Sequence, residues 1–214
     1  EFEDRETLPT TDEERHQFHD TLERDDVIGR RPLLVRMLVA AGGALGLAAL
    51  FPIRSLGPDP GDTLERTSWE GGRRLVTAEG VAVRATDVPL DGLVTVFPDG
   101  DVGSADGQAV LIRVRPGLMD PRPGREDWSP KGLIAYSKVC THAGCPVGLY
   151  QADIHQLLCP CHQSAFDVLR AARPTFGPAA RPLPQLPLRI DDDGFVVARG
   201  DFSEPVGPAW WDRR

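Results

Sequence analysis

Residues 140–164 read CTHAGCPVGLYQADIHQLLCPCHQS and contain every cysteine of the chain. Two boxes lie at the ends of this stretch, CTHAGC at 140–145 and CPCHQS at 159–164. Cysteines and histidines interleaved over so short a distance indicate a metal site or a disulfide framework rather than scattered core thiols. Ligands of one centre must converge, so we expect the fold to place the two boxes on neighbouring loops.

Three kinds of site are open for these boxes. Zinc sites usually use C-x₂₋₄-C and H-x₃₋₅-H spacing, whereas the first box has C-x-H-x₂-C, and six potential ligands exceed the need of one tetrahedral zinc. Two plain disulfides would leave both histidines without a purpose. In one variety of [2Fe–2S] cluster, two thiolates bind one iron and two imidazoles bind the other. Each box offers one of each, so we favour the cluster.

The charge of the chain is concentrated at its beginning. Residues 1–32 contain eleven acids and five arginines, a net charge of −6 out of −8 for all 214 residues. We expect this segment to be solvated, with at most short helices. The remainder is nearly neutral and has no basic stretch of the kind that nucleic acids require, so we expect no nucleic-acid partner. The 41% of apolar residues fits one well-buried domain with extensions.

Residues 33–53, LLVRMLVAAGGALGLAALFPI, form an apolar stretch with a single charge, Arg36. As a helix this stretch would be about 31 Å long, close to the roughly 30 Å of a bilayer's hydrocarbon core. Its three glycines would let partner helices approach closely. A buried core helix is the alternative, and we favour a transmembrane helix.

Arginines define the orientation of this predicted span. Arg30, Arg31 and Arg36 flank its N-terminal end, and the positive-inside rule then places residues 1–32 in the cytoplasm. Everything after the span lies on the extracytoplasmic side of the cell membrane. Residues 54–63, RSLGPDPGDT, have two prolines and two glycines with little to bury, and they predict a hinge linker.

Short apolar and alternating runs from residue 74 onward predict an all-β head over residues 64–214. The Asp191-Asp192-Asp193-Gly194 turn between the last two runs is a strong hairpin signal. Residues 118–131 are expected to form a surface loop. The predicted strands are 74–78, 81–85, 93–97, 108–114, 132–139, 156–158, 165–169, 186–190 and 195–199.

The two boxes closely resemble those of the Rieske iron–sulfur protein family. The extra cysteine in each box resembles the pattern of the cytochrome bc complex branch of this family. Three further stretches resemble the actinobacterial quinol–cytochrome c reductase form: YSKVCTHAGC (136–145), FGPAARPLPQLPLRI (176–190) and GPAWW (207–211). The resemblance covers most of the chain. It implies a mainly β protein, with a Rieske-type all-β head, an inserted cluster-binding subdomain at about 138–182 and a preceding transmembrane helix. It also implies two further membrane helices upstream.

This resemblance also implies the residues of the site. One [2Fe–2S] cluster would be held by the ligands Cys140, His142, Cys159 and His162. A disulfide would join the remaining two cysteines, Cys145 and Cys161. A Pro-rich loop would cover the cluster, and its residues are Gly177, Pro178 and Ala179.

Two further positions concern the electronic properties of the cluster. Ser164 matches the position whose hydroxyl donates to a cluster sulfide. Phe166 departs from the family, because many bc-complex members have a tyrosine there that donates to a ligand sulfur. Loss of a donor disfavours the more negative, reduced cluster, so we expect a lowered potential within the Rieske span of about −150 to +300 mV.

The function implied by the resemblance is electron transfer in a quinol–cytochrome c reductase. His142 and His162 would exchange a proton with quinol, expected to be menaquinol, while the electron passes to a c-type haem. The implied partners are a cytochrome b subunit, a c-type cytochrome subunit and a terminal oxidase. Two rivals stay open: a Rieske subunit of another exported oxidoreductase such as arsenite oxidase, and a non-redox, zinc-stabilised anchored binding module.

Overall fold

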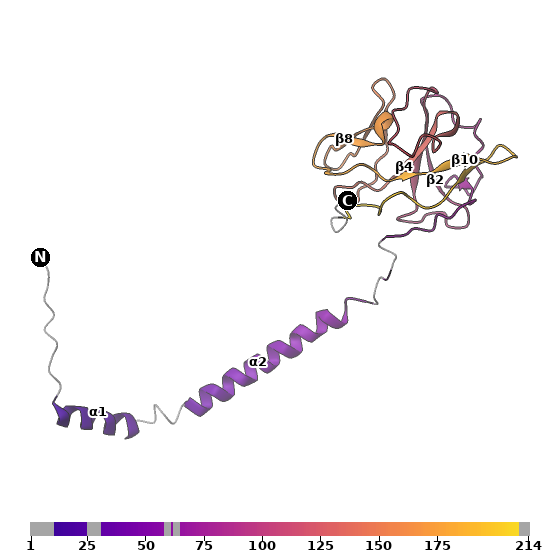
Figure 1. Cartoon of the computed structure of the whole chain (residues 1–214). Helices are drawn as coiled ribbons and strands as arrows, with labels where there is room; N and C mark the ends of the chain where they lie inside the picture. The colour runs from indigo at the N-terminus through magenta and orange to yellow at the C-terminus, as the bar shows by residue number, and fades with distance from the viewer. Residues whose placement is uncertain (1–10, 25–30, 58–60, 62–64, 210–214) are drawn as a thin grey trace, which may run out of the picture. The chain divides into compact units, whose positions relative to one another are not determined.

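A computed structural model describes residues 11–24, 31–57, 61 and 65–209 of the chain. The chain separates into two compact units, residues 1–59 and residues 60–214 (Figure 1). Parts of three predicted segments lie outside the described residues. They are residues 1–10 and 25–30 of the acidic segment, with Arg30 among them, residues 58–60, 62 and 63 of the hinge, and Trp210 and Trp211 of the GPAWW motif.

The described residues of the first unit form two helices. Helix α1 (Asp12–Arg24) begins after Thr11, whose hydroxyl accepts a hydrogen bond from the Glu14 N–H at 3.3 Å. The Glu14 carboxylate in turn accepts from the Thr11 N–H at 2.9 Å, which completes a capping box. The described side chains of α1 are exposed and mostly polar, in agreement with a short solvated helix.

Helix α2 (Arg31–Arg54) contains the whole of the predicted span at residues 33–53. It is 24 residues long, its most apolar window has a mean hydropathy of 2.0, and none of that window is buried. Among the described residues it is the one helix long and apolar enough to cross a membrane. A helix that is apolar all round is stable in lipid rather than in water. This points to a single membrane anchor within the described part of the chain.

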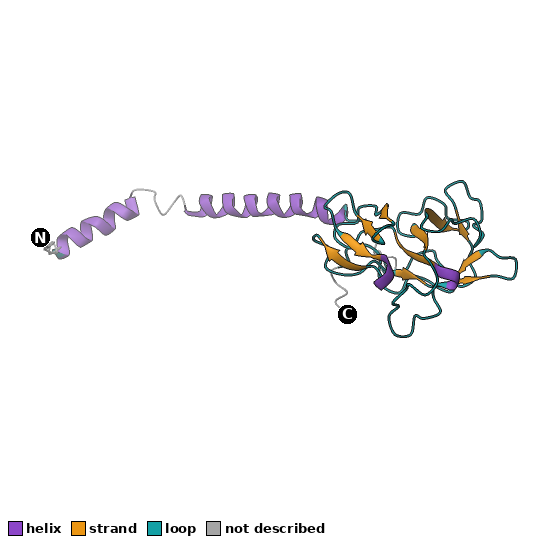
Figure 2. Ribbon diagram, turned by 90° about the horizontal axis from the view of Figure 1, so that it is seen from above, coloured by secondary structure: helices purple, strands orange, loops and turns teal. Residues whose placement is uncertain are grey.

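The second unit is a head of short antiparallel strands joined by long loops (Figure 2). One sheet has five strands in the order β1 (Leu75–Val76), β2 (Leu93–Pro98), β3 (Ala109–Arg113), β4 (Leu133–Ser137) and β9 (Gln185–Leu186). A second has four strands in sequence order, β5 (Leu149–Gln151), β6 (Gln156–Leu158), β7 (Ala165–Asp167) and β8 (Arg173–Phe176). A hairpin pairs β10 (Leu188–Ile190) with β11 (Val196–Ala198), and two single turns of 3₁₀ helix are η1 (Pro130–Gly132) and η2 (Val168–Arg170).

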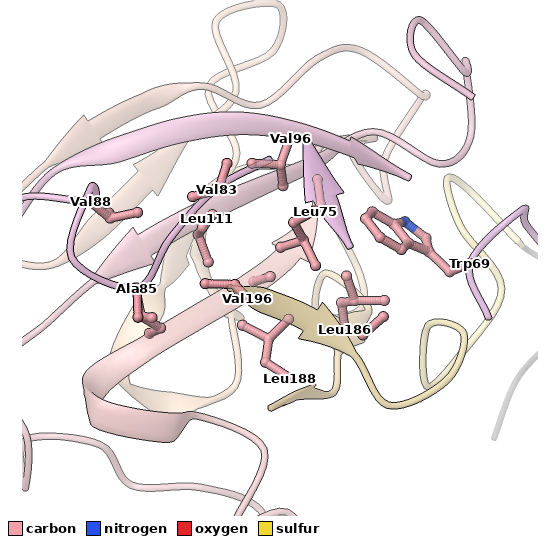
Figure 3. Packing of buried hydrophobic residues seen from close by; sticks show 14 residues of the cluster. Trp69, Leu75, Val83, Ala85, Val88, Val96, Leu111, Leu186, Leu188 and Val196 are labelled. Carbon is pink, nitrogen blue, oxygen red and sulfur yellow. The ribbon is translucent and has the colours of Figure 1, made fainter. Parts of the chain in front are cut away.

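Strands β3 and β4 are buried on both faces. Successive side chains of a strand point to opposite faces, and here alternate residues enter two different hydrophobic cores. The base core lies between the five-stranded sheet and the β10–β11 hairpin, and Figure 3 shows it with ten of its residues labelled. They are Trp69, Leu75, Val83, Ala85, Val88, Val96, Leu111, Leu186, Leu188 and Val196.

The other face of β3 and β4 packs against the four-stranded sheet. We call this second group of buried residues the cluster-side core, and it includes both a cysteine of the first box and a cysteine of the second. The five-stranded sheet therefore serves as the floor on which the two boxes are built. The cluster-side core comprises Val110, Ile112, Val114, Ile134, Tyr136, Cys140, Val147, Leu157, Cys159, Phe166, Val168, Ala172, Ala179 and Leu183.

Most of the predicted strands are present, with three differences. Residues 81–85 form only two isolated bridges, Ala82 with Val76 and Arg84 with Phe195. The predicted strand 186–190 is broken at Pro187, because a proline has no N–H to give to the ladder, and its halves become β9 and β10 in different sheets. Strands β5 and β8 were not predicted.

Candidate metal centre

Two loops with the same hydrogen-bond pattern present the two boxes. In each loop the N–H of the first cysteine donates to the carbonyl five residues on, and the N–H four residues on donates back to the carbonyl of that cysteine. The bonds are Cys140 N to Cys145 O (2.8 Å), Gly144 N to Cys140 O (2.9 Å), Cys159 N to Ser164 O (2.9 Å) and Gln163 N to Cys159 O (3.0 Å).

We call residues 140–145 the first ligand loop and residues 159–164 the second ligand loop. The backbone of the two loops also turns at equivalent positions. Gly144 has φ 79° and Gln163 has φ 59°, so both lie in the left-handed region four residues after the first cysteine. Glycine adopts this region freely, whereas a glutamine does so at a cost. The strain at Gln163 indicates that the second loop is held in this shape by its surroundings.

The first cysteine of each box points into the protein. Cys140 is 0% exposed and Cys159 is 2% exposed, and both belong to the cluster-side core. Burial raises the pKa of the Cys140 thiol, while the N–H groups of His142 and Ala143, which donate to its sulfur, act in the opposite direction. Those donors favour the thiolate, the form of cysteine that binds metals.

The two box histidines lie side by side. Their ring centroids are 4.7 Å apart and the ring planes meet at 81°. The Nδ1 atom of His142 is buried and has no hydrogen-bond partner among the described residues, and a buried polar atom without a partner is costly unless a ligand satisfies it. His162 is exposed.

This donor set fits a Rieske cluster. The structure buries Cys140 and Cys159 in the same core, where the Cys159 thiol contributes to the raised pKa of Cys140, and it brings His142 close to His162. Two thiolates suit one iron and two imidazoles suit the other, and the orphaned His142 Nδ1 is the kind of atom that an iron would satisfy. The four predicted ligands therefore form two matched pairs from the two loops.

The second cysteine of each box lies nearer the surface. Cys145 is half-buried and Cys161 is exposed, and the sulfurs of Cys145, Cys159 and Cys161 all lie within 4.8 Å of one another. A hydrogen bond with the Cys145 thiol raises the pKa of Cys161 to about 11. All four cysteines are free thiols in the structure. A disulfide between Cys145 and Cys161 stays a prediction, and the three close sulfurs define a competing thiol site.

We expect the Cys145–Cys161 disulfide to contribute about 2–4 kcal/mol to the free energy of unfolding. Replacing both cysteines with serine should lower the stability by that amount, as measured by denaturant unfolding of the purified protein. Treatment of the original chain with a mild reductant should produce the same loss. Peptide mapping without reductant that finds both thiols free would contradict the pairing.

A third wall of the site comes from the predicted cover loop. A Cβ atom added at Gly177, which has φ 85°, would lie 2.6 Å from Ser164 Cα and 2.7 Å from the Gln163 carbonyl oxygen. The backbone of the cover loop therefore touches the backbone of the second ligand loop. Pro178 is exposed and Ala179 is buried, so the loop turns its last residue inward.

Ser164 connects the second ligand loop to the cover loop. Its side chain is fully buried, and its Oγ accepts a hydrogen bond from the Ala179 N–H at 3.1 Å. A hydroxyl that accepts one bond keeps its proton for donation. Donation from Ser164 to a cluster sulfide, predicted from the sequence, is compatible with this geometry and stays a prediction.

The histidine between the boxes lies apart from these groups. His155 Nδ1 is 2.9 Å from the Tyr150 hydroxyl and 4.0 Å from the Asp91 carboxylate, in a part-buried cluster of its own. Burial and the nearby Asp91 charge raise the pKa of Tyr150 to about 12. The prediction that His155 is a polar residue rather than a ligand agrees with this placement.

Sequence reasoning missed one contact at the site. The Thr141 hydroxyl, inside the first box, donates to the carbonyl of Arg181 at 2.7 Å. The signal available in the sequence was a polar residue beside a buried ligand cysteine, since Thr141 is only 5% exposed and a buried hydroxyl requires a partner. Arg181 itself is too distant in sequence for spacing to indicate it.

Comparison with known proteins defines the class first. Residues 101–187 match the family model of the Rieske [2Fe–2S] domain. The predicted fold class is thereby confirmed, as is the [2Fe–2S] cofactor that such a domain implies.

Curated relatives then define the family. The chain is 41% identical over 198 residues to the cytochrome bc1 complex Rieske iron–sulfur subunit of Streptomyces coelicolor, covering 89% of this chain and 56% of that one. It is 44% identical to that of Streptomyces lividans (75% and 99%) and 50% identical to that of Corynebacterium glutamicum (71% and 42%). This chain belongs to the family of cytochrome bc1 complex Rieske iron–sulfur subunits, as its sequence predicted, and it spans 56% of the length of the Streptomyces coelicolor relative.

Proposed function

We propose that this chain is the electron-transfer subunit of a quinol–cytochrome c reductase, with its cluster held by Cys140, His142, Cys159 and His162. The observation that carries the proposal is the buried, unpartnered Nδ1 of His142, which lies in a loop matched to the loop of His162. Relatives named as bc1 complex subunits support the same role.

When bound, a Rieske cluster accepts and returns one electron. The chain's own part concerns the proton. An imidazole that binds iron through Nδ1 has only Nε2 left, so Nε2 of His142 or His162 would accept a hydrogen bond from the quinol hydroxyl and take its proton. The exposure of His162 favours access from solvent or from a quinol pocket. The buried cysteines and Ala179 keep water from the opposite side of the site.

The proposed partners are a cytochrome b subunit, a c-type cytochrome subunit that receives the electron, and an associated terminal oxidase. Menaquinol is the proposed donor. Arg31 and Arg36, at the start of α2, support a cytoplasmic N-terminal segment and an extracytoplasmic head through the positive-inside rule. Residues 54–63, with their prolines and glycines, would act as the hinge between membrane and head.

The choice of menaquinol rests on Phe166. Its ring is fully buried in the same core as Cys140 and Cys159, and it brings no hydrogen-bond donor to them. We expect Phe166→Tyr to raise the reduction potential by about 40 mV for each ~1 kcal/mol of net hydrogen bonding to a ligand sulfur. Protein-film voltammetry measures this shift.

The control for this substitution is Phe97→Tyr, at a half-buried position of β2 in the five-stranded sheet. It adds the same hydroxyl at a residue outside the cluster-side core, and the potential should stay unchanged. A lowered or unchanged potential in Phe166→Tyr would argue against the tuning role.

Electron paramagnetic resonance of the reduced, purified protein tests the proposed function. A reduced Rieske cluster has one unpaired electron, so a [2Fe–2S] spectrum with nitrogen hyperfine coupling from two imidazoles is expected. Metal analysis should find two irons and two acid-labile sulfides per chain. Zinc in place of iron, in natively prepared protein, would favour the non-redox binding module instead.

A further inference from the structure

The last described residues of the chain form a strap on the head. We use "C-terminal strap" for residues 205–209, of which Pro205, Gly207 and Ala209 are buried. A terminal segment without regular structure is buried only where it is tied down. The question is what ties it and what it covers.

Ion pairs and backbone bonds fix the strap where it begins. The Glu204 carboxylate lies 2.7 Å from a guanidinium nitrogen of Arg125 and 3.2 Å from one of Arg122. The Ser203 N–H donates to the carbonyl of Gln185, in β9, at 3.1 Å. The residues directly before the strap are thus attached both to the loop after β3 and to the five-stranded sheet.

Arg181 holds the strap itself. Its Nη2 donates to the Pro205 carbonyl at 2.5 Å and to the Gly207 carbonyl at 2.6 Å. The backbone carbonyl of Arg181 also accepts a hydrogen bond from the hydroxyl of Thr141. Thr141 lies between the two predicted ligands Cys140 and His142. One residue therefore links the strap to the first ligand loop.

The strap also touches the first ligand loop directly. A Cβ atom added at Gly207 would lie 3.4 Å from Cγ1 of Val139, the residue before Cys140, and one added at Gly144 would lie 4.0 Å from Cδ of Pro208. The second ligand loop is supported differently, by the cover-loop backbone at Gly177. Each loop has its own support, and the strap is the support of the first.

We propose that Arg181 is a positioning residue of the metal centre, which holds the C-terminal strap against the first ligand loop and so fixes Cys140 and His142. The proposal rests on the proposed function only in taking this loop to be a ligand loop. It adds that the strap, through Arg181, sets the properties of a cluster whose proposed ligands all lie more than forty positions earlier in the sequence.

Hydrogen exchange of the full chain tests the mechanical part. Arg181→Lys keeps the charge but replaces the guanidinium, whose Nη2 donates to both strap carbonyls, with an ammonium on a shorter stem. A chain ending at Glu204 removes the strap. We expect several-fold faster exchange at the amides of Cys140 and Gly144 in both variants, with the second-loop amides unchanged. The second loop serves as an internal control in every sample.

The matched control is Arg84→Lys. Arg84 also donates to a backbone carbonyl, that of Asp193, at 2.7 Å, and it contacts the hairpin turn rather than a ligand loop. This variant should leave both loops unchanged. Equal exchange rates of the first-loop amides in Arg181→Lys and in the original chain would overturn the proposal. Lysine is a mild replacement, so this comparison tests the proposal even if the shortened chain does not fold.

The reduction potential gives a second reading in loaded protein. Loosening of the first loop weakens the N–H donors to the Cys140 sulfur, so the potential of Arg181→Lys should fall while that of Arg84→Lys stays constant. An unchanged potential together with unchanged exchange rejects the positioning role. Absence of any cluster signal from the original chain would instead count against the proposed function, and the exchange result would still decide the role of the strap.

Discussion

Replacing Cys140 with serine is expected to remove the [2Fe–2S] signal from the reduced protein and to lower bound iron and sulfide to near zero. Cys140 is fully buried in the cluster-side core beside Cys159, so its sulfur is held where a metal thiolate would be shielded from water. A serine oxygen is a harder ligand than a thiolate and its hydroxyl is far less acidic, so it suits an iron–sulfur cluster poorly. Metal analysis and electron paramagnetic resonance give the readout.

The matched control is an outer cysteine, Cys161. Cys161→Ser should keep iron and sulfide near two each per chain, because the proposed ligands do not include it. The competing site formed by the sulfurs of Cys145, Cys159 and Cys161 predicts the reverse. Iron retained in Cys140→Ser but lost in Cys161→Ser would therefore show that the ligand set is wrong.

Gly177→Ala should detach the cover loop from the second ligand loop. The added methyl would lie 2.6 Å from Ser164 Cα and 2.8 Å from Ser164 N, and backbone atoms cannot rotate away as a side chain can. Steric overlap and a φ of 85° together should cost about 2–4 kcal/mol of stability. The Ser164–Ala179 hydrogen bond should break, and iron should be lost several-fold faster to a chelator.

Gly117→Ala separates the two causes. Gly117 has φ 87°, but a Cβ atom there would have no neighbour within 4 Å. This control carries the backbone strain alone, so we expect about 1 kcal/mol of lost stability and an unchanged rate of iron release. Equal behaviour of the two variants would mean that the contact between Gly177 and the second loop does not hold the cover loop in place.

The sequence was most informative where a physical period or spacing was strong. The short apolar runs in residues 108–114 and 132–139 predicted β3 and β4, and the apolar length of residues 33–53 predicted α2. Strands β5 and β8 escaped because they are short edge strands, and β8 contains Pro174, which argues against a strand. Pro187 was visible in the sequence, but residues 186–190 were still predicted as one strand, whereas they divide between two sheets.

The site shows the same division between local and long-range information. The box spacing indicated a shared metal site, and the resemblance implied its four ligands. The structure places His142 and His162 side by side and buries Cys140 and Cys159 in one core. The left-handed turn at Gln163 could not be predicted, because glutamine rarely adopts it and the surroundings impose it. Nor could spacing reveal Arg181, whose partners Thr141 and Pro205 lie far from it in the chain.

The sheet formed by β3 and β4 has a further consequence for the whole head. Alternate side chains of these strands enter opposite cores, so both faces of the two strands are buried. The base core and the cluster-side core therefore share these strands and cannot separate without exposing them. Heat should accordingly melt the base and the iron-bearing half in one cooperative event. A substitution that disturbs packing at Leu111 or Ala135, in the base core, would then also shorten the lifetime of the bound cofactor, although neither residue lies in the cluster-side core.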